Sequence, residues 1–149
     1  MTEIMIRTSV DLAANADDAW RVFGEGFGEW AQWAPGIDKS TLQGPLVEGA
    51  TRINETPTLG KVAQRLSRYQ PDARALAYDM SSGLPPFLDS VHNDWSIEAV
   101  GADHCRLSGA ARFVLKAAAA PKKPQIEVKM TQALDSFAAA FRETVEGKG

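Results

Sequence analysis

Hydrophobic and polar residues alternate along residues 4–12, with the apolar side chains at every second position. A period of two is typical of a strand that buries one face and exposes the other. The same period recurs in short stretches between residues 40 and 79, then over residues 90–100 and 106–116. Turn-forming residues separate these stretches at close intervals, so the pattern predicts antiparallel hairpins.

The last part of the chain has a different period. In "PQIEVKMTQALDSFAAAFRETVE" the large apolar residues recur every three or four positions, at Ile126, Met130, Leu134, Phe137, Phe141 and Val145. This spacing places them in one stripe along a helix of roughly twenty residues. Residues 116–124 before it read as the end of a strand and a loop. A long amphipathic helix that follows several strands needs a sheet to lie against.

Two short helices are predicted between the first strand and the rest of the sheet. Asn15 is a suitable N-cap for a helix that runs to Gly24, because acidic residues follow in its first turn. The stretch "GEWAQWAPGI" predicts a second short helix, closed by Pro35 and Gly36.

Composition limits the classes of function. The chain has 149 residues, which predicts one domain over residues 1–149. Its net charge is −3, and its sequence lacks the clustered basic residues that are typical of a nucleic-acid-binding surface. It begins without a long apolar run, which predicts a cytoplasmic protein with no membrane insertion. The single cysteine and two widely spaced histidines do not form a metal-ligand pattern, so we expect no metal and no cofactor.

The order of these elements resembles the helix-grip fold of the START-related SRPBCC superfamily, which includes polyketide cyclases, dehydrases and lipid-transport proteins. The resemblance covers nearly the whole chain and rests on "AANADDAWRVF", "EWAQWAPGI", "LSRYQPDARALAYDM" and the "SGLPPF" loop followed by "DWSIEAVG". It implies an α+β fold in which a curved antiparallel sheet of about seven strands wraps around a long C-terminal helix, with two short helices after the first strand. It also implies an apolar cavity between sheet and helix.

Strand phase identifies the side chains that would face this cavity. Gly109 lies among large inward residues and is expected to leave room for a ligand. The candidate ligand-binding residues are Gln64, Leu66, Arg68, Tyr78, Asn93, Trp95, Gly109 and Phe113 from the strands, and Met130, Leu134 and Phe137 from the helix. "SGLPPF" is placed at the cavity entrance.

Polar residues on the inward face can orient a carbonyl or hydroxyl group of an otherwise apolar ligand. Arg68 matters most for an enzyme, since a fixed cation stabilises a developing enolate oxygen. Arg52 is a second such cation in a weaker phase position.

His92 and Asp94 form a tempting acid–base pair, but their parity places them on the outer, solvated face of the strand, opposite Trp95. His104 and Cys105 are adjacent and therefore point to opposite faces, which disfavours a nucleophile pair. No catalytic residue is assigned from the sequence.

Three functions follow, in order of preference. The first is binding of a small hydrophobic molecule such as a lipid, polyketide or aromatic compound, and the second is a cavity enzyme of the polyketide cyclase/dehydratase type. The third is a protein-interaction module without a ligand. The first two differ in whether Arg68, Tyr78 and Asn93 converge on one point; a homodimer is left open.

Overall fold

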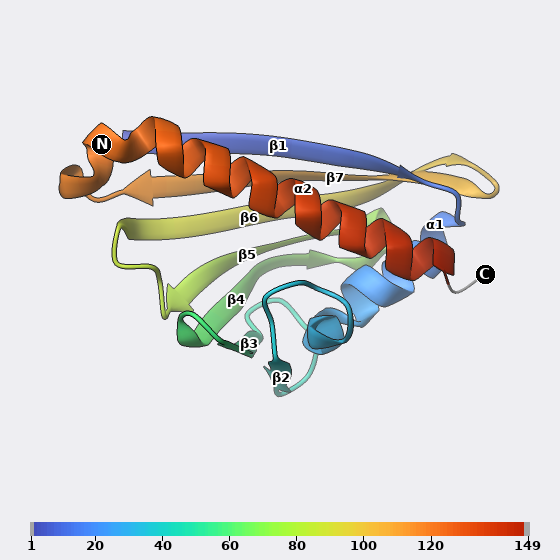
Figure 1. Cartoon of the computed structure of the whole chain (residues 1–149). Helices are drawn as coiled ribbons and strands as arrows, with labels where there is room; N and C mark the ends of the chain where they lie inside the picture. Colours follow the sequence, from blue (N-terminus) through green and yellow to red (C-terminus); the bar gives the residue numbers. More distant parts are fainter. Residues whose placement is uncertain (1, 148–149) are drawn as a thin grey trace.

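The computed structural model describes residues 2–147 and contains one sheet of seven antiparallel strands (Figure 1). The strands are β1 (Thr2–Leu12), β2 (Lys39–Gln43), β3 (Thr51–Thr56), β4 (Gly60–Gln70), β5 (Ala75–Ser82), β6 (Leu88–Gly101) and β7 (His104–Leu115). Their spatial order is β1-β7-β6-β5-β4-β3-β2, so β1 closes against the last strand. Every other pairing joins strands that are consecutive in the chain, as expected for hairpins.

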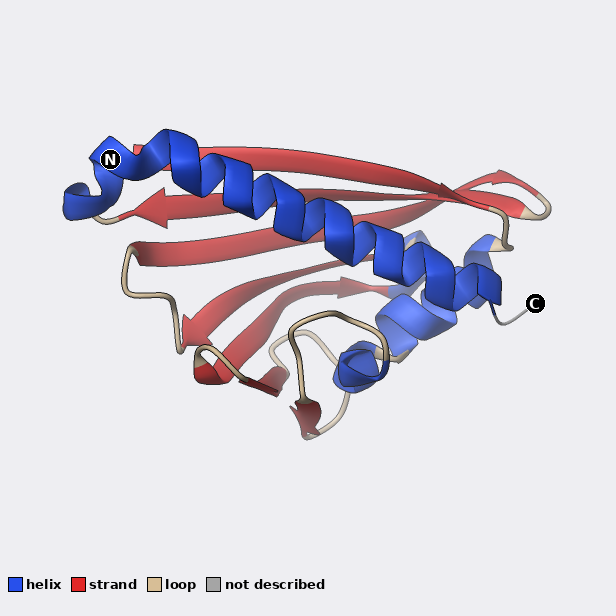
Figure 2. Cartoon of the chain, in the orientation of Figure 1, coloured by secondary structure: helices blue, strands red, loops and turns tan. Residues whose placement is uncertain are grey.

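The long helix α2 (Lys123–Gly147) lies along one face of the curved sheet (Figure 2). The predicted helix-grip fold is thus confirmed. A short 3-10 helix, η4 (Ala117–Lys122), precedes α2 where the sequence predicted a loop. The run of alanines favours helical turns there, and Pro121 is tolerated because Pro lacks only a donor that short helical turns leave unused.

The segment after β1 departs from the two predicted helices. Only α1 (Ala16–Trp20) is α-helical; a π-helical turn, η1 (Arg21–Glu25), and a 3-10 helix, η2 (Phe27–Gln32), follow it. The predicted N-cap is present, because the Asn15 side chain accepts hydrogen bonds from the two backbone N–H groups that follow at 2.8 and 3.3 Å. Glycines at every second position weaken a regular helix beyond this point.

Helix α2 is fastened to the sheet mainly over its C-terminal half. Its buried residues are Leu134, Ala138 and Phe141, whereas Ile126 and Met130 in the first half are only partly buried. Among the strands, α2 makes its main contacts with β1. The first half of the helix therefore contributes few side chains to the closed core.

Two hydrogen bonds fix α2 against β1 and the turn after it. The Thr8 hydroxyl donates to the Asp135 carboxylate at 3.0 Å, and the backbone N–H of Ala13 donates to the Glu146 carboxylate at 2.8 Å. The second bond holds the pKa of Glu146 below its ordinary value. These contacts place one side of α2 along the sheet edge and turn another side toward the middle strands.

Truncation of Phe141 should therefore destabilise the fold strongly. Phe141 is completely buried, so Phe141→Ala should lower the free energy of unfolding by about 3–5 kcal/mol. The control is Val128→Ala on the same helix, because that valine is 57% exposed and its truncation should change the value by less than about 0.5 kcal/mol. Urea denaturation measures both, and equal losses would contradict this packing.

Candidate functional site

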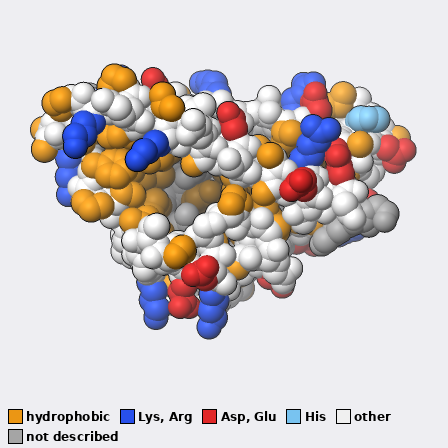
Figure 3. Space-filling model, in the orientation of Figure 1, with side chains coloured by type: hydrophobic (Ala, Val, Ile, Leu, Met, Phe, Trp, Pro, Cys, Tyr) orange, Lys and Arg blue, Asp and Glu red, His pale blue; other side chains and the backbone are white. Residues whose placement is uncertain are grey.

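A hollow opens between the first half of α2 and the middle strands (Figure 3). Hydrophobic side chains cover much of its wall in this view. The elements that frame it are the end of β5, the β5–β6 loop and α2 (Figure 1). Their apolar side chains that pack on the core but stay partly exposed are Met80 on β5, Leu84 and Phe87 in the loop, and Ile126, Met130 and Phe137 on α2. We call this the apolar hollow.

The backbone of the β5–β6 loop is fixed by a required glycine and by hydrogen bonds. Gly83 adopts a positive φ of 79°, and a Cβ there would lie 2.5 Å from the Lys61 carbonyl oxygen, so glycine is required. The backbone N–H of Leu88 donates to the Pro85 carbonyl at 3.0 Å, and that of Lys116 donates to the Phe87 carbonyl at 3.0 Å. The "SGLPPF" segment is thereby tied to the end of β7.

Aromatic rings fill the space behind the C-terminal half of α2. Phe23 packs against Trp30, Trp95 and Phe141 at ring-centroid distances of 4.8, 5.5 and 5.1 Å. Phe137 bridges this cluster and the apolar hollow, since it is partly exposed yet lies 5.0 Å from the Trp95 ring. The site therefore has a closed aromatic wall on one side and an open mouth on the other.

Arg52 on β3 is completely buried next to this wall. Its guanidinium lies 3.8 Å from the centre of the Phe27 ring and 4.1 Å from that of Trp30, distances at which a cation is attracted to an aromatic face. It donates to the Phe27 carbonyl at 2.9 Å and, through Nε, to Gln64 Oε1 at 3.0 Å; Nη2 also donates to that oxygen.

No carboxylate neutralises this cation among the ion pairs formed by residues 2–147. Burial lowers the pKa of Arg52 to about 10, so the side chain stays protonated at neutral pH. Burial also raises the pKa of Tyr78, although the nearby Arg52 charge opposes that rise. Arg52 thus holds η2 against β3 and leaves a fixed positive charge inside the protein.

The candidate ligand residues divide into two groups. Leu66, Tyr78, Trp95, Phe113 and Leu134 belong to the buried core. Gln64, Asn93, Met130 and Phe137 are partly exposed, and Asn93 pairs with Tyr78 and Ala111 in the middle of the sheet. Contact of either group with a ligand remains a prediction.

The inward placement of Arg68 was wrong. A register shift between Leu66 and Arg68 reverses the alternation of β4, so Arg68 points outward and donates to the Asp94 carboxylate at 3.1 Å. Tyr69 turns inward instead and stacks on Trp20 at 5.8 Å. Arg68 therefore does not converge with Tyr78 and Asn93, which was the arrangement expected of a cavity enzyme.

The room expected at Gly109 is also absent. Gly109 pairs directly with Trp95, and a Cβ on the glycine would lie 2.3 Å from the indole ring. The indole occupies the place that a side chain at position 109 would need. The indole N–H of Trp95 is itself buried without a hydrogen-bond acceptor among residues 2–147.

His92 and Asp94 lie on the outer face, as their parity predicts. His92 Nδ1 is 2.7 Å from an Asp79 oxygen and Nε2 is 2.8 Å from an Asp94 oxygen, and these side chains are all partly exposed. Asp94 also accepts the bond from Arg68. The group forms a polar network on the side of the sheet away from α2.

Sequence reasoning underrated Arg52, although β3 carries a signal. Arg52 and Asn54 are buried while Ile53 between them is only partly buried, so the strand has its polar residues inside. A strand whose inward parity is polar, next to the inward Gln64 of β4, indicates an internal hydrogen-bonded group. Gln64 Oε1 indeed accepts from Asn54 at 3.0 Å.

Adding a side chain at position 109 should destabilise the fold. Gly109→Ala should lower the free energy of unfolding by about 1–3 kcal/mol, because the new methyl group displaces the Trp95 indole. Gly101→Ala is the control, since the nearest atom to its added Cβ is 4.0 Å away and the change should be below about 0.5 kcal/mol. If the Gly109→Ala protein were as stable as the parent in thermal unfolding, there would be empty space beside Gly109 after all.

Removal of the buried guanidinium should also be costly. Arg52→Met keeps most of the volume but removes the guanidinium bond to the buried Phe27 carbonyl and leaves Gln64 Oε1 with Asn54 as its remaining side-chain donor, so the free energy of unfolding should fall by about 1–3 kcal/mol. Arg65→Met on the exposed side of β4 should have little effect. An Arg52→Met protein more stable than the parent would mean that the charge, not its hydrogen bonds, dominates the energetics.

Residues 2–147 contain no cluster of three or more acidic, histidine or cysteine side chains suited to a metal ion. No helix in the same range is long and apolar enough to span a membrane.

Comparison with known proteins places the chain in a family. The fold is similar to that of the Zhui aromatase/cyclase from Streptomyces sp. R1128, with a TM-score of 0.81 and 17% identity over 99% of this chain and 96% of that one. A point mutant of norcoclaurine synthase from Thalictrum flavum, in complex with a transition-state analogue, gives a TM-score of 0.77 and 20% identity over 99% and 98%. A solution structure of a Thermobifida fusca protein gives a TM-score of 0.71 and 25% identity over 95% of each chain.

No curated protein matches the chain significantly in sequence. The model of one family, described as polyketide cyclase / dehydrase and lipid transport, matches residues 3–146. The chain belongs to this polyketide cyclase / dehydrase and lipid transport family.

Proposed function

We propose that the protein binds a small hydrophobic molecule in the apolar hollow. The observation that carries this proposal is the partial exposure of six apolar side chains on α2, β5 and the β5–β6 loop, the elements that border one recess (Figures 1 and 3). Burying exposed apolar area gains roughly 25 cal/mol per Å². A ligand that covers these side chains would complete the burial that the first half of α2 leaves unfinished.

The family and the similar structures support a ligand site of this kind. Lipid transport and polyketide cyclisation both involve largely apolar molecules, and both appear in the description of the family. The Zhui protein is described as an aromatase/cyclase, and norcoclaurine synthase was captured with a transition-state analogue. Because the sequence identity to both structures is low, we assign none of their functional residues to this chain.

Binding without catalysis is preferred over a cavity enzyme. Among the candidate polar residues, Gln64 and Asn93 are amides that do not exchange protons at neutral pH, and Gln64 Oε1 already accepts from Arg52 and Asn54. Tyr78 is buried, and burial raises the pKa of its hydroxyl. Arg52 already donates to protein acceptors and is inaccessible. An interaction module is not favoured either, because the most exposed large hydrophobic residues, including Met5, Val47 and Val100, lie on different elements.

A charged group in the lining should block binding. Titration with the neutral fluorophore N-phenyl-1-naphthylamine should raise its emission with the parent protein, and Met130→Asp should weaken its affinity by about tenfold or more, because a carboxylate would have to be desolvated. Val128→Asp is the matched control: it adds the same charge two positions away, at a side chain that is 57% exposed.

The two variants must unfold at similar temperatures for the comparison to hold. Loss of binding in Met130→Asp with retention in Val128→Asp supports the apolar hollow as the site. A parent protein that leaves the fluorophore dark, or equal affinity in both variants, would contradict the proposal.

A further inference from the structure

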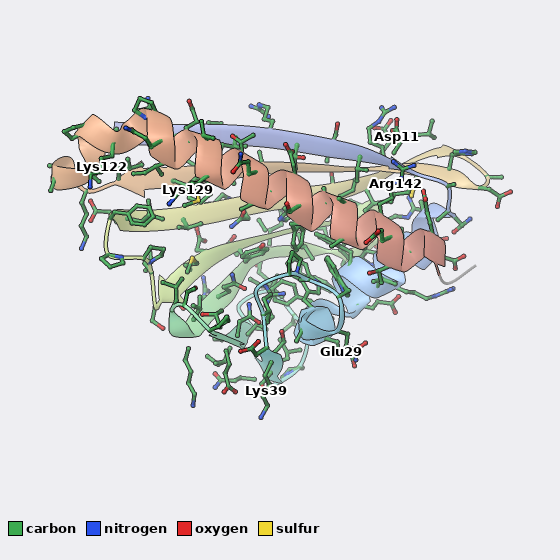
Figure 4. All side chains as sticks on the ribbon, viewed as in Figure 1. Asp11, Glu29, Lys39, Lys122, Lys129 and Arg142 are labelled. Atoms are coloured by element: carbon green, nitrogen blue, oxygen red, sulfur yellow. The ribbon has the colours of Figure 1, made fainter. Side chains whose placement is uncertain are left out.

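We infer that the ligand of the apolar hollow is an amphiphile with one anionic group, a carboxylate or a phosphate, held at the mouth by Lys122 and Lys129. This inference rests on the proposed function and adds the chemical class of the ligand. Figure 4 labels both lysines, and in the same view they lie along the part of the chain that overhangs the recess in Figure 3.

The charge around the mouth differs from that of the chain as a whole. The protein has a net charge of −3, yet residues 116–130 contain four of its sixteen basic residues and one of its nineteen acidic residues. This segment comprises η4 and the first turns of α2, which are the elements beside the hollow. Local positive charge in an acidic protein favours an anionic partner at this place.

Helix geometry places Lys129 on the hollow side of α2. Successive residues turn by about 100°, so Lys129 lies only about 60° around the helix from Ile126 and about 120° from Asp135. Asp135 accepts the hydrogen bond from Thr8 of β1, which identifies the sheet-edge side of the helix. Lys129 therefore projects beside the partly buried Ile126, away from β1.

The two lysines can act on one anion. Lys122 ends η4 and Lys129 lies seven positions later in α2, and each flexible side chain carries its ammonium group about 6 Å from the backbone. Neither forms a salt bridge with another residue in the 2–147 range. Both ammonium groups are thus available for charge-assisted hydrogen bonds to carboxylate or phosphate oxygens.

The opposite orientation, with the anion at Arg52, fits the structure less well. Arg52 is completely buried between aromatic rings, and each of its three nitrogens already donates to an oxygen of the protein. An anion at the mouth also keeps much of its hydration, whereas one at the aromatic wall would lose it. The apolar part of the ligand then contacts Met80, Met130 and Phe137.

Calorimetric titration with dodecanoate, dodecyl phosphate and dodecanol, below their aggregation limits and at low salt, tests this inference. The two anions should bind at least about fivefold more tightly than the alcohol, and added salt should reduce the difference. Lys122→Gln/Lys129→Gln should weaken anion binding by about five- to twentyfold and leave dodecanol unchanged. Lys39→Gln/Lys61→Gln removes the same charge on strands β2 and β4 and should have little effect.

A preference for either anion supports the inference, and the order of the two identifies the head group. Equal affinity for dodecanol and the anions, or equal losses in the two double variants, would overturn it while leaving the proposed function intact. Failure of all three compounds to bind would overturn the proposed function as well.

Discussion

The structure depends on how α2 is attached to the sheet. Leu134, Ala138 and Phe141 lock the second half of the helix into the core, and Glu146 anchors its end to the turn after β1. Within residues 2–147, the first half of α2 has no fully buried side chain, although its apolar stripe continues through the partly buried Ile126 and Met130. Because this stripe extends beyond the closed core, it leaves apolar surface that a ligand could cover. The β5–β6 loop lies across the hollow from this part of α2 (Figure 1).

Arg52 holds the elements of the inner wall together. Its buried charge is costly unless neighbouring groups compensate it, and here aromatic faces and neutral oxygens do so instead of a carboxylate. The guanidinium joins η2 to β3 and β4 and so fixes the aromatic wall that closes the inner end of the hollow. In the proposed binding mode the anion is therefore held by the exposed lysines Lys122 and Lys129 and not by Arg52.

The sequence predicted the sheet, the long helix and the outward placement of His92, because periods of two and of 3.6 are set by backbone geometry. It failed where that geometry is interrupted: the register shift before Arg68 reversed the facing of one candidate residue. It also failed where two side chains compete for one space, since nothing in the strand phase of Gly109 reveals that the Trp95 indole turns onto it. The lysines were overlooked because an exposed cation is informative only when its position beside a recess is known.

The most direct test of ligand binding in the hollow is NMR of the protein labelled at its methionine methyl groups. Met80 and Met130 border the hollow, whereas Met5 is 51% exposed on β1 and pairs with Arg112 at the opposite face. Titration with dodecanol should shift the methyl signals of Met80 and Met130 together and leave that of Met5 in place. Shifts confined to Met5, or none in a protein shown by calorimetry to bind, would place the ligand elsewhere and contradict the account.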